Sequence, residues 1–240
     1  MAGLFLFVVN HEARGGQANK MFWISVYLFG NPEHFVIHAT GERVGMIFVI
    51  LLQKLFNMKR TLVIHPKDKS TDFLKPIYAN IEGATIVTEG WSKEDVNAAI
   101  DTHDRIIMMG HGSPYGLFSI GRFIDTKNGF IIDAHSVKHL RGKECIFIWC
   151  YASDFVNYHN LKGFSTGMFI SEVGEAYACR IIEPTQQMVD GSNSFFVDTI
   201  SENVDLTLKE IYDATTKRYS EYAKRNTIAH YNNSRLVCIE

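Results

Sequence analysis

The chain has 240 residues, of which 46% are apolar and 21% are charged, and this balance is typical of a globular protein with a hydrophobic core. Its formal net charge is −2 and its basic residues are scattered, so composition points to neither nucleic acid nor an anionic membrane as a partner. The cysteines form no Cys-x-x-Cys pair, which argues against a zinc ribbon and favours free thiols in a reducing, cytoplasmic compartment. They are Cys145, Cys150, Cys179 and Cys238.

The first 57 residues lack the regular periodicity of helices and strands. Within them, the segment 46–56 is strongly apolar but too short to span a bilayer, and it could be a surface or core helix. We therefore expect residues 1–57 to be an N-terminal extension, either translated upstream of a protein that begins at Met58 or poorly ordered. Residues 58–240 are expected to form an α/β domain.

From residue 61 onward, short apolar runs alternate with helical patterns. The runs predict strands over residues 61–65, 84–88, 105–109 and 145–149. The patterns between them predict helices over residues 71–80, 93–101 and 134–140, with Ser70, Ser92 and Asp133 as the respective N-caps. Two further runs, 116–124 and 129–132, flank an Asn-Gly turn signal and predict a β-hairpin inserted after the third strand. This order indicates a mostly parallel sheet with helices on both faces.

The remaining third of the chain has a weaker pattern. It suggests a helix over 169–178, a strand over 179–182, helices over 191–203 and 205–224, and a last strand over 235–239. The segment 163–167 is flanked by glycines, and we expect it to be a loop that forms one wall of a cleft beside Cys150. Residues 188–196 are expected to form another wall.

Two reactive residues follow predicted strands. His111 comes after the run 105–109, and Cys150 comes after the run 145–149. Ligands bind at the carboxyl ends of the strands in open parallel sheets, so neighbouring strands would bring both side chains to one edge. There the histidine would serve as base for a cysteine nucleophile. The amides of Gly112 and Cys150 would hold the developing oxyanion.

An apolar strand ending in His-Gly, a hairpin, a helix and a second apolar strand ending in Cys together resemble the caspase-like cysteine peptidases. Here the two strands read Ile106-Ile107-Met108-Met109-Gly110-His111-Gly112 and Ile146-Phe147-Ile148-Trp149-Cys150-Tyr151. The resemblance covers residues 60–182 and implies a three-layer sandwich and a cysteine endopeptidase with a His111–Cys150 dyad. Departures from the better-known members are the large Trp149 before the nucleophile and the Tyr151-Ala152-Ser153-Asp154 sequence after it. These departures leave open a catalytically inactive binding or regulatory module of the same fold.

Weaker candidates surround the dyad. Contacts with substrate are expected, less strongly, from His65, Ser113, Tyr115 and Asp154. The His-Gly-Ser sequence also occurs in chelatases of the sirohydrochlorin type, where a second histidine completes a metal site, and His65 would have to serve here. We expect no metal and no cofactor, a protein or peptide as substrate, and no stable insertion into a membrane.

Overall fold

The computed structural model describes residues 4–9, 21–28, 35–40, 59–126 and 129–240. The chain divides into two compact units, Met1–Met58 and Lys59–Glu240, which we describe separately. In the first unit, the strands β1 (Leu4–Val9), β2 (Met21–Leu28) and β3 (Phe35–Thr40) form an antiparallel sheet in that order. The apolar segment 46–56 and Met58 lie outside the described residues. The structure does not test whether translation begins at Met58, and this expectation stays a prediction.

The second unit contains a six-stranded sheet in the order β12-β11-β10-β6-β4-β5. The strands are β4 (Thr61–Ile64), β5 (Thr85–Val87), β6 (Arg105–Met109), β10 (Glu144–Ile148), β11 (Gly163–Thr166) and β12 (Leu236–Ile239). Five of them run parallel, and β12 pairs antiparallel with β11. The predicted α/β fold with a mostly parallel sheet is therefore confirmed.

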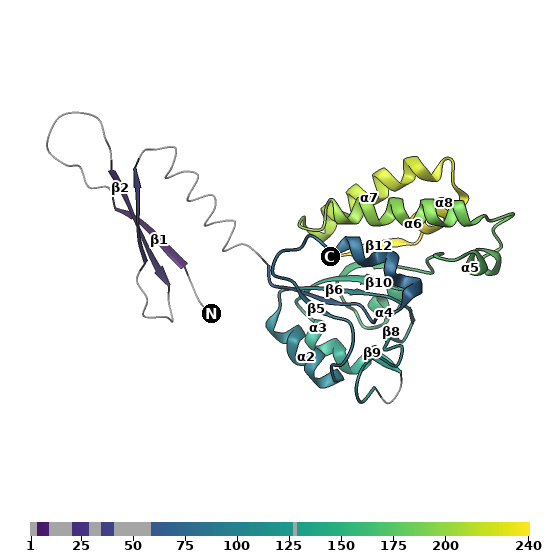
Figure 1. Cartoon of the computed structure of the whole chain (residues 1–240), viewed down its shortest axis with the longest axis horizontal. Coiled ribbons are helices and arrows are strands. Elements are labelled where there is room, and N and C mark those ends of the chain that lie inside the picture. The colour runs from purple at the N-terminus through teal and green to yellow at the C-terminus, as the bar shows by residue number, and fades with distance from the viewer. Residues whose placement is uncertain (1–3, 10–20, 29–34, 41–58, 127–128) are drawn as a thin grey trace. The chain divides into compact units, whose positions relative to one another are not determined.

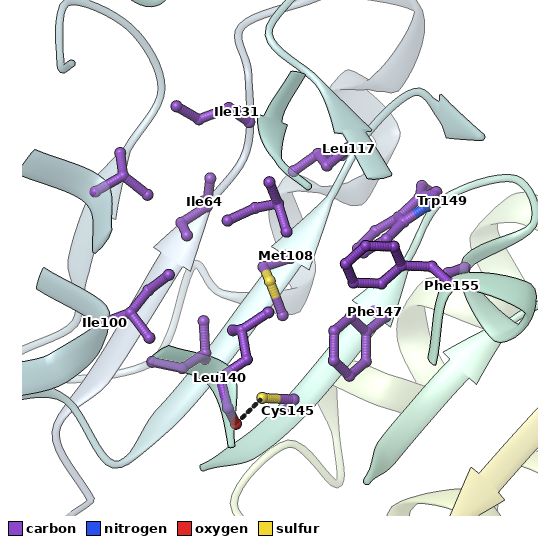
Figure 2. Packing of buried hydrophobic residues seen from close by; sticks show 14 of the residues in the cluster. Ile64, Ile100, Met108, Leu117, Ile131, Leu140, Cys145, Phe147, Trp149 and Phe155 are labelled. Carbon is purple, nitrogen blue, oxygen red and sulfur yellow. Dashed lines mark hydrogen bonds between the residues drawn. The ribbon is translucent and has the colours of Figure 1, made fainter. Parts of the chain in front are cut away.

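Side chains of the central strands alternate between two cores, as the period of two in a strand requires. Ile106 and Met108 of β6 lie in one core, whereas Ile107 and Met109 lie in the other. Figure 2 shows the first core, where Met108 lies close to residues from β4, β10 and the neighbouring helices. Both faces of the sheet are thus covered by apolar packing.

Helices from different parts of the chain cover the two faces (Figure 1). One face packs against α2 (Lys93–Thr102), α3 (Val137–Leu140) and α4 (Ala152–Tyr158). The other packs against the 3-10 helix η1 (Lys69–Ile77), α6 (Gln186–Ser201), α7 (Leu208–Ala223) and α8 (Thr227–Asn233). The short η2 (Ala134–Ser136) leads into α3, and α5 (Val173–Ala178) lies between β11 and α6 in the chain.

A small antiparallel sheet follows β6, made of β7 (Gly112–Ser113), β8 (Gly116–Phe118) and β9 (Phe130–Ile132). Its β8–β9 pair corresponds to the predicted hairpin, although β8 ends earlier than the run 116–124 suggested. Residues 127 and 128 of the connecting turn lie outside the described residues.

Several sequence predictions were wrong. Residues 163–166 form the fifth parallel strand, β11, rather than a loop, and residues 179–182 form no strand. The helix predicted over 169–178 begins only at Val173. Residues 188–196 lie inside α6, with several side chains buried in the core. The N-cap of η1 is Asp68 rather than the predicted Ser70, whose amide donates a hydrogen bond to the Asp68 side chain. The helix α8 was not predicted.

Within the described residues, no helix combines the length and apolar character that crossing a bilayer requires.

Candidate active site

The carboxyl ends of β6 and β10 lie side by side at the centre of the sheet. The two strands pair in parallel as far as Met109 and Ile148, and the Gly110 amide donates to the Ile148 carbonyl at 3.0 Å. His111 and Cys150 each follow this last pair by two residues. The fold therefore brings the two reactive residues to the same edge of the sheet.

Trp149 explains the glycine at position 112. The indole is buried, and its Nε1 donates to the Ser113 carbonyl at 3.1 Å. A Cβ added to Gly112 would lie 2.2 Å from Trp149 Cδ1 and 2.7 Å from the Gly116 carbonyl oxygen. The missing side chain thus admits the large residue before Cys150, which is the sequence feature that departs from the better-known caspase-like peptidases.

The ring of His111 faces the beginning of η1. Its Nε2 lies 2.7 Å from the Ser70 hydroxyl and 4.0 Å from the Asp68 carboxylate. Asp68 accepts hydrogen bonds from both the amide and the hydroxyl of Ser70, and these hydrogen bonds lower the pKa of its carboxyl group. Sequence reasoning did not identify Ser70 and Asp68 as neighbours of His111, because only the tertiary fold brings η1 to the end of β6.

Cys150 has a different partner. Its half-buried thiol donates to the Phe169 carbonyl, with 3.4 Å between sulfur and oxygen. Burial raises the pKa of this thiol to about 11, although the hydrogen bond to Phe169 opposes the shift. In this conformation the thiol is protonated at neutral pH, and within the described residues it shares no hydrogen bond with His111.

The backbone amides of Gly112 and Cys150 are available to a ligand. The Phe118 amide donates to the His111 carbonyl, and in an antiparallel ladder hydrogen-bonded and non-hydrogen-bonded pairs alternate. The next pair, Gly112 with Leu117, is therefore non-hydrogen-bonded, and the Gly112 amide points away from β8. Among the described residues, the Cys150 amide has no hydrogen-bond acceptor.

The segment that holds the Cys150 thiol is itself fixed by α8. The side chain of the buried Asn232 accepts from the Ile170 amide at 2.8 Å and donates to the Ile170 carbonyl at 2.9 Å. These two hydrogen bonds hold the backbone next to Phe169. Phe169 and Asn232 were not recognised from the sequence, since neither belongs to a motif.

Of the weaker candidates, His65 is tied into the core. Both of its ring nitrogens lie 3.0 Å from a hydroxyl oxygen, one from Tyr78 and the other from Thr71, and burial lowers its pKa to about 4. The ring also borders a cavity of about 160 Å³ that Lys67 and Lys75 help to line. No ring nitrogen of His65 is left for a metal ion of the chelatase kind.

The other three candidates lie nearer the surface. Ser113 is the last residue of β7, and Tyr115 lies in the turn between β7 and β8. The Tyr115 side chain is exposed, and its amide donates to the Ser113 hydroxyl. Asp154 is exposed in the first turn of α4. In the part of the chain that the structure describes, no three histidine, cysteine or acidic side chains cluster as metal ligands.

No family model matches the chain, and no curated protein matches it.

Proposed function

We propose that this protein is a cysteine endopeptidase of the caspase-like kind, with Cys150 as nucleophile and His111 as general base. The observation that carries the proposal is the equivalent placement of the two residues beyond the last pair of β6 and β10. Support also comes from the two free amides at Gly112 and Cys150, because an acyl-transfer site needs donors for the developing oxyanion. The antiparallel insertion after the His-Gly strand agrees with the same fold.

The chemistry follows from these positions. The His111 imidazole takes the thiol proton, and the Cys150 thiolate attacks the carbonyl carbon of the scissile peptide bond. The amides of Gly112 and Cys150 donate to the oxyanion. The imidazolium then protonates the amine that leaves, and a water molecule deprotonated by the neutral imidazole hydrolyses the acyl-enzyme. For this reaction the Cys150 thiol must exchange the Phe169 carbonyl for His111 as its acceptor.

A second candidate is a catalytically inactive module of the same fold. The observation that favours it is the pairing of each reactive side chain with another partner, His111 with Ser70 and Cys150 with Phe169. Under this alternative the thiol keeps its raised pKa of about 11 and never forms an ion pair with the imidazole.

Alkylation of Cys150 distinguishes the two candidates. Labelling with iodoacetamide is followed by peptide mass spectrometry from pH 5 to pH 10. An active dyad predicts labelling that is already substantial near pH 7 and falls in His111→Ala. An inactive module predicts a rate that rises about tenfold per pH unit up to pH 10, as for an isolated thiol of high pKa, with no effect of His111→Ala.

Digestion of a peptide library tests the activity itself and reads the residue preferred at the cleavage site. The wild type is compared with Cys150→Ala and with Cys238→Ala, a control that removes a half-buried thiol from β12. We expect cleavage by the wild type and the control only. Equal cleavage by Cys150→Ala would exclude Cys150 as the nucleophile.

A further inference from the structure

The pair formed by Asp68 and Ser70 has a role toward His111 that capping of η1 does not explain. The cap itself is the hydrogen bond from the Ser70 amide to Asp68 Oδ1, at 2.9 Å. It uses neither the Ser70 hydroxyl nor any part of His111. Yet the hydroxyl oxygen lies 2.8 Å from Asp68 Oδ1 and 2.7 Å from His111 Nε2. These distances link three side chains in a row.

Counting protons fixes the direction of both hydrogen bonds. A hydroxyl has one proton, and a carboxylate only accepts. The pKa of Asp68 is lowered mainly by the hydrogen bonds from Ser70, so its carboxyl group is ionised at neutral pH. Ser70 therefore donates its proton to Asp68. Its contact with His111 is then a hydrogen bond only if His111 Nε2 carries a proton and donates it to Ser70.

We propose that Asp68 and Ser70 are positioning residues that hold His111 in the Nε2–H tautomer and leave Nδ1 as the nitrogen that accepts the Cys150 proton. This inference rests on the proposed function of the dyad. The hydrogen bond on one ring nitrogen decides which tautomer a histidine adopts and how its ring is oriented. Ser70 thereby fixes the ring with respect to the end of β10.

The same arrangement stabilises the charged ring. After Nδ1 takes the thiol proton, the imidazolium still donates from Nε2 to Ser70. The Asp68 carboxylate, 4.0 Å from Nε2, supplies the opposite charge. The side chains of His111 and Asp68 are 32% and 27% exposed, so solvent screens this attraction only in part. Arg122 also lowers the pKa of Asp68 by its positive charge, and its Nε donates to the Lys67 carbonyl at 3.2 Å.

Nitrogen-15 NMR of the histidine rings tests the tautomer without any need for catalysis. In the wild type, we expect the neutral His111 ring to carry its proton on Nε2, and Ser70→Thr, which keeps a hydroxyl, to preserve this signal. In Ser70→Ala the Nε2 proton should exchange faster with water, because it has lost its acceptor. A wild-type ring protonated on Nδ1 would overturn the assignment.

Iodoacetamide labelling of Cys150 near pH 7 tests the effect on the dyad. We expect the rate to fall about tenfold in Ser70→Ala, to recover in Ser70→Thr and to fall in Asp68→Asn, which keeps the cap but removes the charge. The matched control is Ser220→Ala, which removes an exposed serine hydroxyl from α7. Equal rates in wild type and Ser70→Ala would refute the positioning role, provided that His111→Ala is slower. A His111→Ala rate equal to that of the wild type would instead refute the dyad, and the NMR result would still decide the tautomer.

Discussion

Replacing Gly112 with alanine tests the interlocking of this position with Trp149. The new Cβ would lie 2.2 Å from Trp149 Cδ1, so the indole must move by about 1.2 Å to reach an ordinary contact of 3.4 Å. The ring has little room, because Phe147 and Phe155 pack against it with centroid distances of 5.5 Å and 5.8 Å. Figure 2 shows this aromatic group at the end of β10.

The cost of Gly112→Ala follows from these contacts. Overpacking a core costs roughly 1–3 kcal/mol. Losing the hydrogen bond from Trp149 to the Ser113 carbonyl adds about 1 kcal/mol. The free energy of unfolding should therefore fall by about 2–4 kcal/mol. In a domain of this size each kcal/mol corresponds to roughly 2–4 °C, so we expect the melting temperature to fall by roughly 10 °C.

A double-mutant cycle with Trp149→Ala separates this clash from any other effect of the added methyl group. Thermal and urea unfolding are measured for the wild type, both single variants and the double variant. Removing the indole opens space for the methyl group added at position 112. The loss in free energy of unfolding of the double variant should therefore be smaller than the sum of the two single losses by more than about 1 kcal/mol. Additive effects, or a fall in melting temperature below about 2 °C for Gly112→Ala alone, would refute the reasoning.

Two further predictions concern the buried polar side chains of His65 and Asn232 and their effects on stability. His65 has a pKa of about 4 in the folded protein and an ordinary value of 6.5, so the unfolded chain binds more protons between these values. Stability should therefore decrease as the pH falls from 6.5 to 4, and urea titrations of His65→Gln should show a flatter pH dependence. Asn232→Leu should lower the free energy of unfolding by about 2–4 kcal/mol, because it leaves the buried amide and carbonyl of Ile170 without partners. A loss below about 0.5 kcal/mol in urea unfolding would contradict this role.

The sequence predicts the strands that carry the candidate dyad because their residues are apolar and bounded by turn signals. β6 is buried along its whole length, as is β10 except at its first residue. Gly110 follows β6, whereas Trp149 and then Cys150 follow β10. The hairpin, the cap of α2 and the last strand were also predictable, since each depends on residues close together in the chain.

β11 was missed because its buried residues are mostly not apolar. It reads Gly163-Phe164-Ser165-Thr166, and the Thr166 hydroxyl donates to the Trp149 carbonyl at 2.8 Å within the sheet. Gly163 is required by packing, since a Cβ there would lie 2.5 Å from the Cys145 carbonyl oxygen. Hydropathy does not report such constraints, which come from the neighbouring strand.

The contacts of the two candidate dyad residues could not be predicted for a similar reason. Ser70 is 41 residues from His111 in the chain, and Phe169 is 19 residues from Cys150. Sequence spacing identifies candidate reactive residues, whereas the side chains and carbonyls that contact them are known only once the strands are packed.

The anchoring of residues 167–170 has a consequence for synthesis of the protein. The Gly167 amide donates to the Arg235 carbonyl, Ile170 is held by Asn232, and β11 pairs with β12. The backbone beside Cys150 therefore lacks these contacts until the ribosome has added residues 232–239. A nascent chain that already contains His111 and Cys150 still lacks the hydrogen bonds that hold the backbone around the thiol.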